Sequence, residues 1–122
     1  MDSTGATSAE GLVELFDRHW NAGNLLEVVM LYEAEAEIKE GDTYYTGHAH
    51  IYEYFTHCRR SPFIRLTIMR NVEIGDGVQV LFVLWQRDRH AGAPSRGGLS
   101  VTTVRRQEDG TWLFSYSVES SL

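Results

Sequence analysis

The chain has 122 residues, of which 43% are hydrophobic and 23% charged, so it fits one globular domain with room for a core and an internal cavity. Its formal net charge is −6 and its single cysteine is Cys58. The acidic balance argues against a broad nucleic-acid surface, and one thiol excludes an internal disulfide or a thiolate zinc cluster. No stretch reaches the roughly 20 apolar residues of a membrane span, and residues 1–7 are small and polar with no apolar signal core. We therefore expect a cytoplasmic domain over residues 8–122, behind a flexible tail, that binds neither nucleic acid nor membrane.

Apolar residues at helical intervals predict three helices. The first is expected over residues 8–22, where Gly23 ends it, and the second over residues 24–32. A third helical pattern occupies residues 47–58, and Pro62 closes it.

From Ala34 onward the apolar period changes to two, which predicts strands. Ala36, Ile38 and Glu40 then share one face of the first strand, because successive side chains of a strand point to opposite sides. Gly- and Asp-containing turns separate the later segments and indicate an antiparallel meander. The expected strands are about 34–40, 44–45, 63–74, 78–90, 98–106 and 112–119.

The strand around residues 80–85 is apolar on both faces. Val80, Phe82 and Leu84 point one way, and Leu81, Val83 and Trp85 point the other. Since a strand exposed on one side should alternate, we expect both faces of this sheet to be covered, one by helices and the other by a second copy in a homodimer. The alternative is a strand shielded by the long stems of neighbouring Arg and Gln side chains.

The order of these elements and four sequence runs carry a family resemblance. The runs are Asn21–Leu25 (NAGNL), Leu31–Ala36 (LYEAEA), Gly47–Phe55 (GHAHIYEYF) and Arg105–Trp112 (RRQEDGTW). Together they resemble the nuclear transport factor 2-like superfamily over about residues 8–120, and in particular its small bacterial SnoaL-like and ketosteroid isomerase-like members. The resemblance implies an α+β cone, with three N-terminal helices packed on a strongly curved, mostly antiparallel sheet that encloses a pocket.

Glu40 is the candidate catalytic carboxylate. It ends an apolar strand face, where ionisation is costly without hydrogen bonds, so we expect it to accept a proton near neutral pH. The resemblance also places Glu40 where the isomerases have their general-base Asp. The alternative is a solvated turn residue beside Gly41 and Asp42.

The partners of Glu40 depart from the isomerases. Phe16 occupies the position of their oxyanion-hole Tyr and has no donor, and the position of their protonated Asp falls at about Thr102. Steroid isomerisation is therefore not expected. Tyr32 and Tyr54, expected on the second and third helices, remain candidate hydroxyl donors near Glu40, although each could instead be a core aromatic residue.

The expected substrate-binding wall is apolar and aromatic. It consists of Phe16, His19, Trp20, Phe55, Cys58, Met69 and Trp85. No metal site is expected, because His50 and His57 lie two helical turns apart, and His48 should be exposed. His19 is a candidate proton shuttle.

Limonene-type epoxide hydrolases are relatives that use an Asp-Arg-Asp set on the sheet. Arg87, Asp88 and Arg89 form one candidate cluster, but the last strand offers Ser115 to Ser117 and no Asp. This chemistry is therefore disfavoured.

The sequence favours a pocket protein for an apolar or aromatic small molecule, with SnoaL-like acid–base isomerisation or cyclisation and no cofactor. Glu40 would move the proton, and Tyr32, Tyr54 or Thr102 would orient the substrate oxygen. The alternative is a non-catalytic ligand-binding or dimerisation module on the same scaffold.

Overall fold

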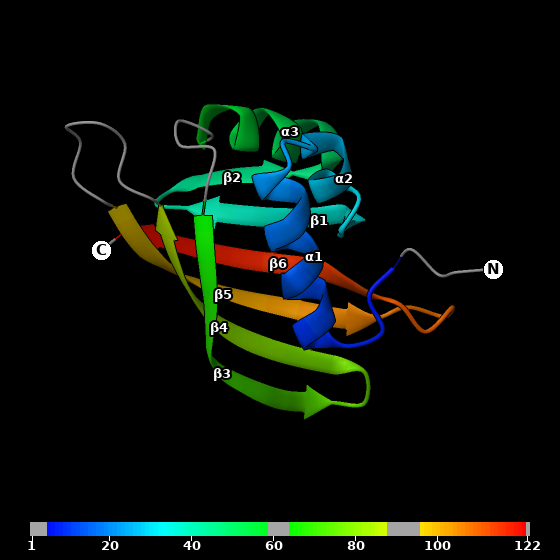
Figure 1. Ribbon diagram of the computed structural model, residues 1–122. Helices are drawn as coiled ribbons and strands as arrows, with labels where there is room; N and C mark the ends of the chain where they lie inside the picture. The colour runs from blue at the N-terminus through cyan, green and yellow to red at the C-terminus, as the bar shows by residue number, and fades with distance from the viewer. Residues whose placement is uncertain (1–4, 59–63, 88–95, 122) are drawn as a thin grey trace.

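The computed structural model describes residues 5–58, 64–87 and 96–121, which form three helices and one six-stranded sheet. The helices are α1 (Ala9–Asn21), α2 (Leu25–Val29) and α3 (Gly47–Cys58). The strands are β1 (Tyr32–Glu40), β2 (Thr43–Thr46), β3 (Ile64–Gly75), β4 (Val78–Arg87), β5 (Arg96–Arg106) and β6 (Trp112–Ser121). The helices lie on one face of a curved sheet, as the α+β cone requires (Figure 1). The predicted fold class is confirmed.

The sheet order is β2-β1-β6-β5-β4-β3, so the last strand lies in the middle. All neighbouring strands are antiparallel except β1 and β6, which run parallel. This parallel pair brings the C-terminal ends of β1 and β6 to the same edge of the sheet. Figure 1 shows α1 crossing in front of the sheet, and α3 beside β1 and β2.

Ser8 caps the N-terminus of helix α1, and its hydroxyl accepts a hydrogen bond from the Gly11 amide at 2.9 Å. Such a cap satisfies an amide that the first helical turn leaves without a partner. Leu12, Val13 and Trp20 are buried on the side of α1 that packs on the sheet. Helix α1 and the sheet therefore enclose a space between them.

The second helix is shorter than predicted. It ends at Val29, and Tyr32 is the first residue of β1 rather than part of the helix. The reason is strand pairing, because the Leu31 carbonyl already accepts a hydrogen bond from the Phe114 amide of β6 at 2.9 Å. The sheet hydrogen bond therefore replaces the next helical one.

The packed part of the chain also starts earlier than expected. The sequence predicts a flexible tail over residues 1–7, yet Ala6 is buried and its carbonyl accepts a hydrogen bond from Trp112 at 3.0 Å. This isolated bridge covers the beginning of β6.

The two faces of the sheet differ. Leu81, Val83 and Val104 are buried on the face toward the helices. Val80, Phe82 and Leu84 point the other way and stay half-buried. Within residues 5–58, 64–87 and 96–121, helices thus cover one apolar face of this strand and not the other.

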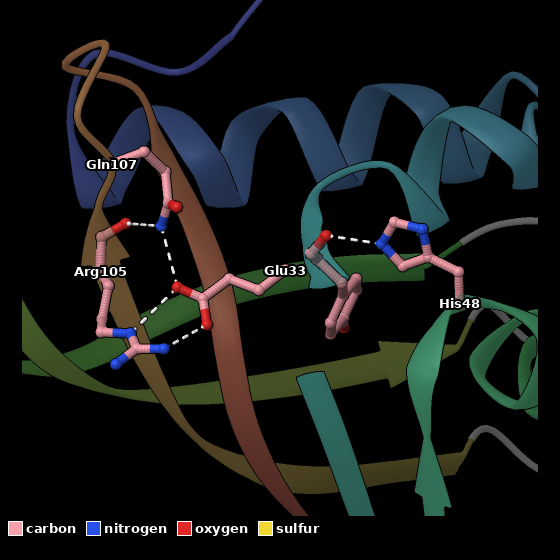
Figure 2. Close-up of polar contacts among 5 residues, drawn as sticks. Glu33, His48, Arg105 and Gln107 are labelled. Atoms are coloured by element: carbon pink, nitrogen blue, oxygen red, sulfur yellow. Dashed lines mark hydrogen bonds and ion pairs between the residues drawn. The ribbon is translucent and has the colours of Figure 1, made fainter. Parts of the chain in front are cut away.

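A polar cluster ties β1 to β5 across β6. The Arg105 guanidinium donates to both carboxylate oxygens of Glu33, at 2.9 and 2.5 Å, and the Gln107 amide donates to Glu33 at 2.9 Å (Figure 2). These hydrogen bonds, led by that from Arg105, lower the pKa of Glu33. Figure 2 also shows His48, whose Nε2 lies 2.8 Å from the Tyr32 carbonyl oxygen. His48 is therefore half-buried and bonded to the backbone, not exposed as expected.

Among the described residues, no helix is long and apolar enough to cross a membrane.

Candidate functional site

A cavity of about 650 Å³ lies between the helices and the inner face of the sheet. All the predicted site residues line it except His19 and Met69. Its walls are largely aromatic, with contributions from both the helices and the sheet. The aromatic lining residues are Phe16, Trp20, Tyr32, Tyr45, Tyr54, Phe55, Trp85 and Phe114.

The rings of the cavity wall pack on one another. Phe16 stacks on Trp20 with centroids 5.7 Å apart, and it meets the edges of Phe55 and Phe114 at 5.7 and 5.9 Å. Tyr32 lies 4.9 Å from Phe114. Such offset and edge-to-face contacts hold aromatic side chains in fixed orientations. Phe16 is thus part of an apolar wall.

Two carboxyl groups, Glu40 and Glu119, line the same cavity. Glu40 is the last residue of β1, and its partner in the parallel register with β6 is Glu119. Paired residues of neighbouring strands point to the same face of the sheet. Glu40 is exposed where the cavity opens to solvent, and Glu119 is half-buried beside it.

Each carboxylate accepts a hydrogen bond from a different element. The Tyr54 hydroxyl of α3 donates to Glu40 Oε2 at 2.8 Å. The Ser100 hydroxyl of β5 donates to Glu119 Oε1. The pKa of Glu119 is raised to about 7, chiefly by burial; the Ser100 hydrogen bond opposes this shift and the nearby charge of Glu40 adds to it. Near neutral pH the pair therefore exchanges one proton at Glu119.

The hydroxyl of Tyr54 stays protonated. Burial raises its pKa, and its hydrogen bond to Glu40 acts in the same direction. Tyr54 is thus a fixed donor to Glu40. Tyr32 is buried in the same wall, and burial raises the pKa of its hydroxyl too.

Thr102 is buried and lines the cavity, but its hydroxyl is already engaged. Its Oγ1 lies 2.6 Å from Ser117 Oγ and donates to the Tyr116 carbonyl at 3.2 Å. Since a hydroxyl has one proton to donate, Thr102 already uses it within the protein, and so does Tyr54, whose proton goes to Glu40.

His19 and Met69 lie outside the cavity. His19 precedes Trp20 on α1 and is therefore turned about 100° away around the helix axis. Met69 is 62% exposed, because it follows Ile68, which packs against the core, and successive strand residues point to opposite faces. The expected wall contributions of these two residues are wrong. Ile64 and Leu66 of β3 line the cavity instead.

Sequence reasoning missed Glu119, and a bulge explains why. Phe114 is buried inside, so strict alternation would turn Glu119 to the outer face. The register shift in the β5–β6 pairing inserts one extra residue after Phe114, and Ser117 and Glu119 then face inward. No turn residue in the sequence marks this bulge.

The described residues include no group of three or more His, Cys, Asp or Glu side chains placed to hold a metal ion. His57 lines the cavity and is exposed at its rim. Of the epoxide-hydrolase cluster, Asp88 and Arg89 lie outside the described residues.

Comparison with known structures agrees with this architecture. An NTF-2-like protein of unknown function from Shewanella oneidensis shares 14% identity over 89% of this chain and 93% of its own, with a TM-score of 0.77. The chain has the nuclear transport factor 2-like fold. A ketosteroid isomerase-like protein from Erwinia carotovora matches at 12% identity, 93% and 92% coverage and a TM-score of 0.78. A putative ketosteroid isomerase from Parabacteroides distasonis matches at 14% identity, 99% and 93% coverage and a TM-score of 0.73.

No protein-family model matches the sequence, and no curated protein matches it either. At these identities the structural likeness establishes the fold alone.

Proposed function

We propose that this protein binds an apolar or aromatic small molecule in its cavity and catalyses a cofactor-independent, SnoaL-like isomerisation or cyclisation by acid–base chemistry. The observation that carries the proposal is the pairing of Glu40 with Tyr54 and Glu119 at the rim of an aromatic cavity of about 650 Å³. A pocket of this size suits a ligand of two or three rings.

Glu40 accepts the proton in this proposal. Its Oε2 accepts the Tyr54 hydroxyl, which fixes the direction of the carboxylate, and its other oxygen is left to meet a substrate C–H or O–H. Below about pH 7 Glu119 is mostly protonated, so the two carboxyl groups are not negatively charged at the same time. The pair can therefore take up or hold one proton. The aromatic walls exclude water and orient the apolar body of the substrate.

Proton exchange on a panel of ketones tests this activity with simple compounds. Aromatic and polycyclic ketones with acidic C–H groups are incubated with the protein in deuterated water, and deuterium incorporation is followed by NMR. We expect catalysed exchange on at least one ketone and a fall of about 100-fold in Glu40→Gln, as general-base loss typically produces.

The matched control is Glu53→Gln, which makes the same change at an exposed position of α3. It should exchange at the wild-type rate. Full activity in Glu40→Gln, or no exchange on any ketone, would reject the acid–base proposal.

The second candidate is a ligand-binding or dimerisation module without catalysis, and the outer face of the sheet supports the dimerisation that it requires. Phe82, Val101 and Val118 are register neighbours on β4, β5 and β6, and all three are half-buried on the face away from the helices. Adjacent apolar side chains on an uncovered face are a frequent sign of association. We propose that a second copy covers this face through a two-fold symmetric interface, in either candidate.

A further inference from the structure

The ionisable groups of the cavity are predominantly acidic. Among its lining residues that the structure describes, Glu40 and Glu119 are the acids and His57, at the exposed rim, is the single basic group. Two carboxyl groups brought together in this way repel one another unless a proton or a cation lies between them. A proton on Glu119 serves this purpose in the free protein.

The hydrogen bonds of the pair leave room for a donor. The Tyr54 hydroxyl occupies one oxygen of Glu40, and the Ser100 hydroxyl occupies one oxygen of Glu119. The second oxygen of each carboxyl has further acceptor sites, because a carboxylate offers about four lone pairs. An ammonium group brings up to three N–H donors and a positive charge to the same place.

The walls next to the pair suit a cation as well as an apolar body. Tyr45 and Tyr54 lie side by side in the lining, with ring centroids 4.6 Å apart, and Tyr54 itself contacts Glu40. The faces of aromatic rings attract cations, and desolvation strengthens that attraction. Acceptors and ring faces thus converge at one end of the cavity, and the hydrophobic rings of Phe16 and Trp20 line it elsewhere.

We propose that the cavity recognises a protonated amine carried on an apolar, ring-containing body, with the ammonium bound between Glu40 and Glu119. This inference rests on the proposed function, since it names the substrate class of the same cavity. When the ammonium enters, Glu119 gives up its proton to solvent, so one positive charge replaces another and the pair stays compensated.

This exchange makes the binding pH-dependent. The other titratable groups among the described lining residues are Tyr32 and Glu40 from β1, Tyr45 from β2, and Tyr54, His57 and Cys58 from α3. Below the pKa of Glu119, about 7, each amine bound must release one proton, so the association constant falls about tenfold for each lower pH unit. Above that pKa the association constant should be constant.

Three ligands with one carbon skeleton test the proposal: 4-phenylbutylamine, 4-phenylbutanol and 4-phenylbutyrate. Binding is followed by the fluorescence of Trp20 and Trp85, which line the cavity, and by calorimetry in buffers of different ionisation enthalpy. At about pH 8 we expect the amine to bind at least about tenfold more tightly than the alcohol and the carboxylate to bind most weakly. Calorimetry near pH 6 should show about one proton released for each amine bound.

Two variants assign the effect to the pair. Glu119→Gln should weaken amine binding about tenfold or more at pH 8 and remove the pH slope, whereas alcohol binding should change little. Glu53→Gln should bind all three ligands as the wild type does. If Glu119→Gln does not fold, the amine proposal is still tested on the wild type, by the pH dependence of the amine association constant and by the ratio of amine to alcohol affinity.

The outcomes separate this inference from the proposed function. Equal binding of amine and alcohol, or amine binding without proton release, would overturn the amine inference and leave the small-molecule cavity intact. If none of the three binds, the amine inference is rejected, and the exchange assay on ketones alone decides the catalytic proposal. Amine binding together with an absence of proton exchange on every ketone would uphold the amine site and reject the catalytic proposal.

Discussion

Glu40 and Glu119 meet because β1 and β6 run parallel and in register at their C-terminal ends. An antiparallel neighbour would place the end of one strand beside the start of the other, and the two carboxyls would then lie apart. The pair therefore depends on the one parallel junction among the described strands. Its chemistry follows from burial, which raises the pKa of Glu119 to about 7.

The Glu119 carboxyl should make stability depend on pH. Its pKa is raised from 4.5 to about 7 on folding, so its contribution is fully present below about pH 4.5 and is lost as the pH rises through 7. Glu119→Gln mimics the protonated group and escapes this loss. Between pH 5 and 8 the variant should gain about 2–3 kcal/mol relative to wild type, at about 1.4 kcal/mol per pH unit.

Urea unfolding at several pH values measures this difference. Glu53→Gln serves as the exposed control and should track the wild type throughout. A constant difference between Glu119→Gln and wild type would mean that Glu119 has the same proton affinity in the folded and unfolded chain.

At the residue scale, the sequence predicted the direction of strand side chains correctly where the alternation between inward- and outward-facing residues is unbroken. Ala36 and Ile38 are buried and Glu40 lines the cavity, as the period of two in β1 predicts. Alternation failed at Glu119, because a register shift in β6 turns the later side chains to the opposite face. Met69 obeys the alternation, since it follows Ile68, which packs against the core.

Strand β5 approaches its neighbours closely at Gly98. A methyl group there would collide with the Ser120 carbonyl oxygen of β6 and with the indole ring of Trp85, its register partner on β4. The indole ring of Trp85 therefore lies against position 98, where only the hydrogen atom of a glycine side chain fits. This contact fixes the position of the ring in the cavity wall. The small side chain at position 98 is therefore required by packing rather than by backbone conformation.

Gly98→Ala should destabilise the protein by about 1–3 kcal/mol, as overpacking of a close contact typically does. It should also shift the tryptophan fluorescence, since Trp85 must move. Gly75→Ala is the matched control, because nothing lies within 4 Å of the added methyl group there. Equal stability of the two variants, measured by chemical unfolding, would contradict the close packing at Gly98.

The elements themselves were largely predictable, because Gly and Pro mark most of their ends. Gly23 and Gly77, both at positive φ, lie at the predicted turns. The end of α2 was not predictable, because a hydrogen bond from β6, some 80 residues later in the chain, ends the helical pattern before Tyr32.

For the whole molecule, the uncovered outer face of the sheet leads to a prediction of oligomeric state. If a second copy covers Phe82, Val101 and Val118, then Val101→Glu buries an unpaired charge and should convert the dimer to a monomer. Thr67→Glu introduces the same charge at an exposed position of edge strand β3 and should leave the dimer intact. Light scattering after size-exclusion chromatography distinguishes these results, and a monomeric wild type would contradict the interface.

The overall architecture followed from the order of the elements and the family resemblance, since helices before a long meander fit few folds. The existence of a cavity was predicted, but its volume did not follow from the sequence, because the volume depends on how far the sheet curves away from α1. Nor did the carboxyl pair, which needs both the parallel β1–β6 junction and the bulge in β6.

The most direct test of the account is an NMR titration of the glutamate side-chain carboxyl carbons in wild type and in Glu40→Gln. We predict that Glu119 titrates near pH 7 in the wild type, and at a lower pH in Glu40→Gln, because the neighbouring negative charge has been removed. A Glu119 carboxyl that titrates near 4.5 in both proteins would contradict the proton-sharing pair and, with it, the proposed chemistry of the cavity.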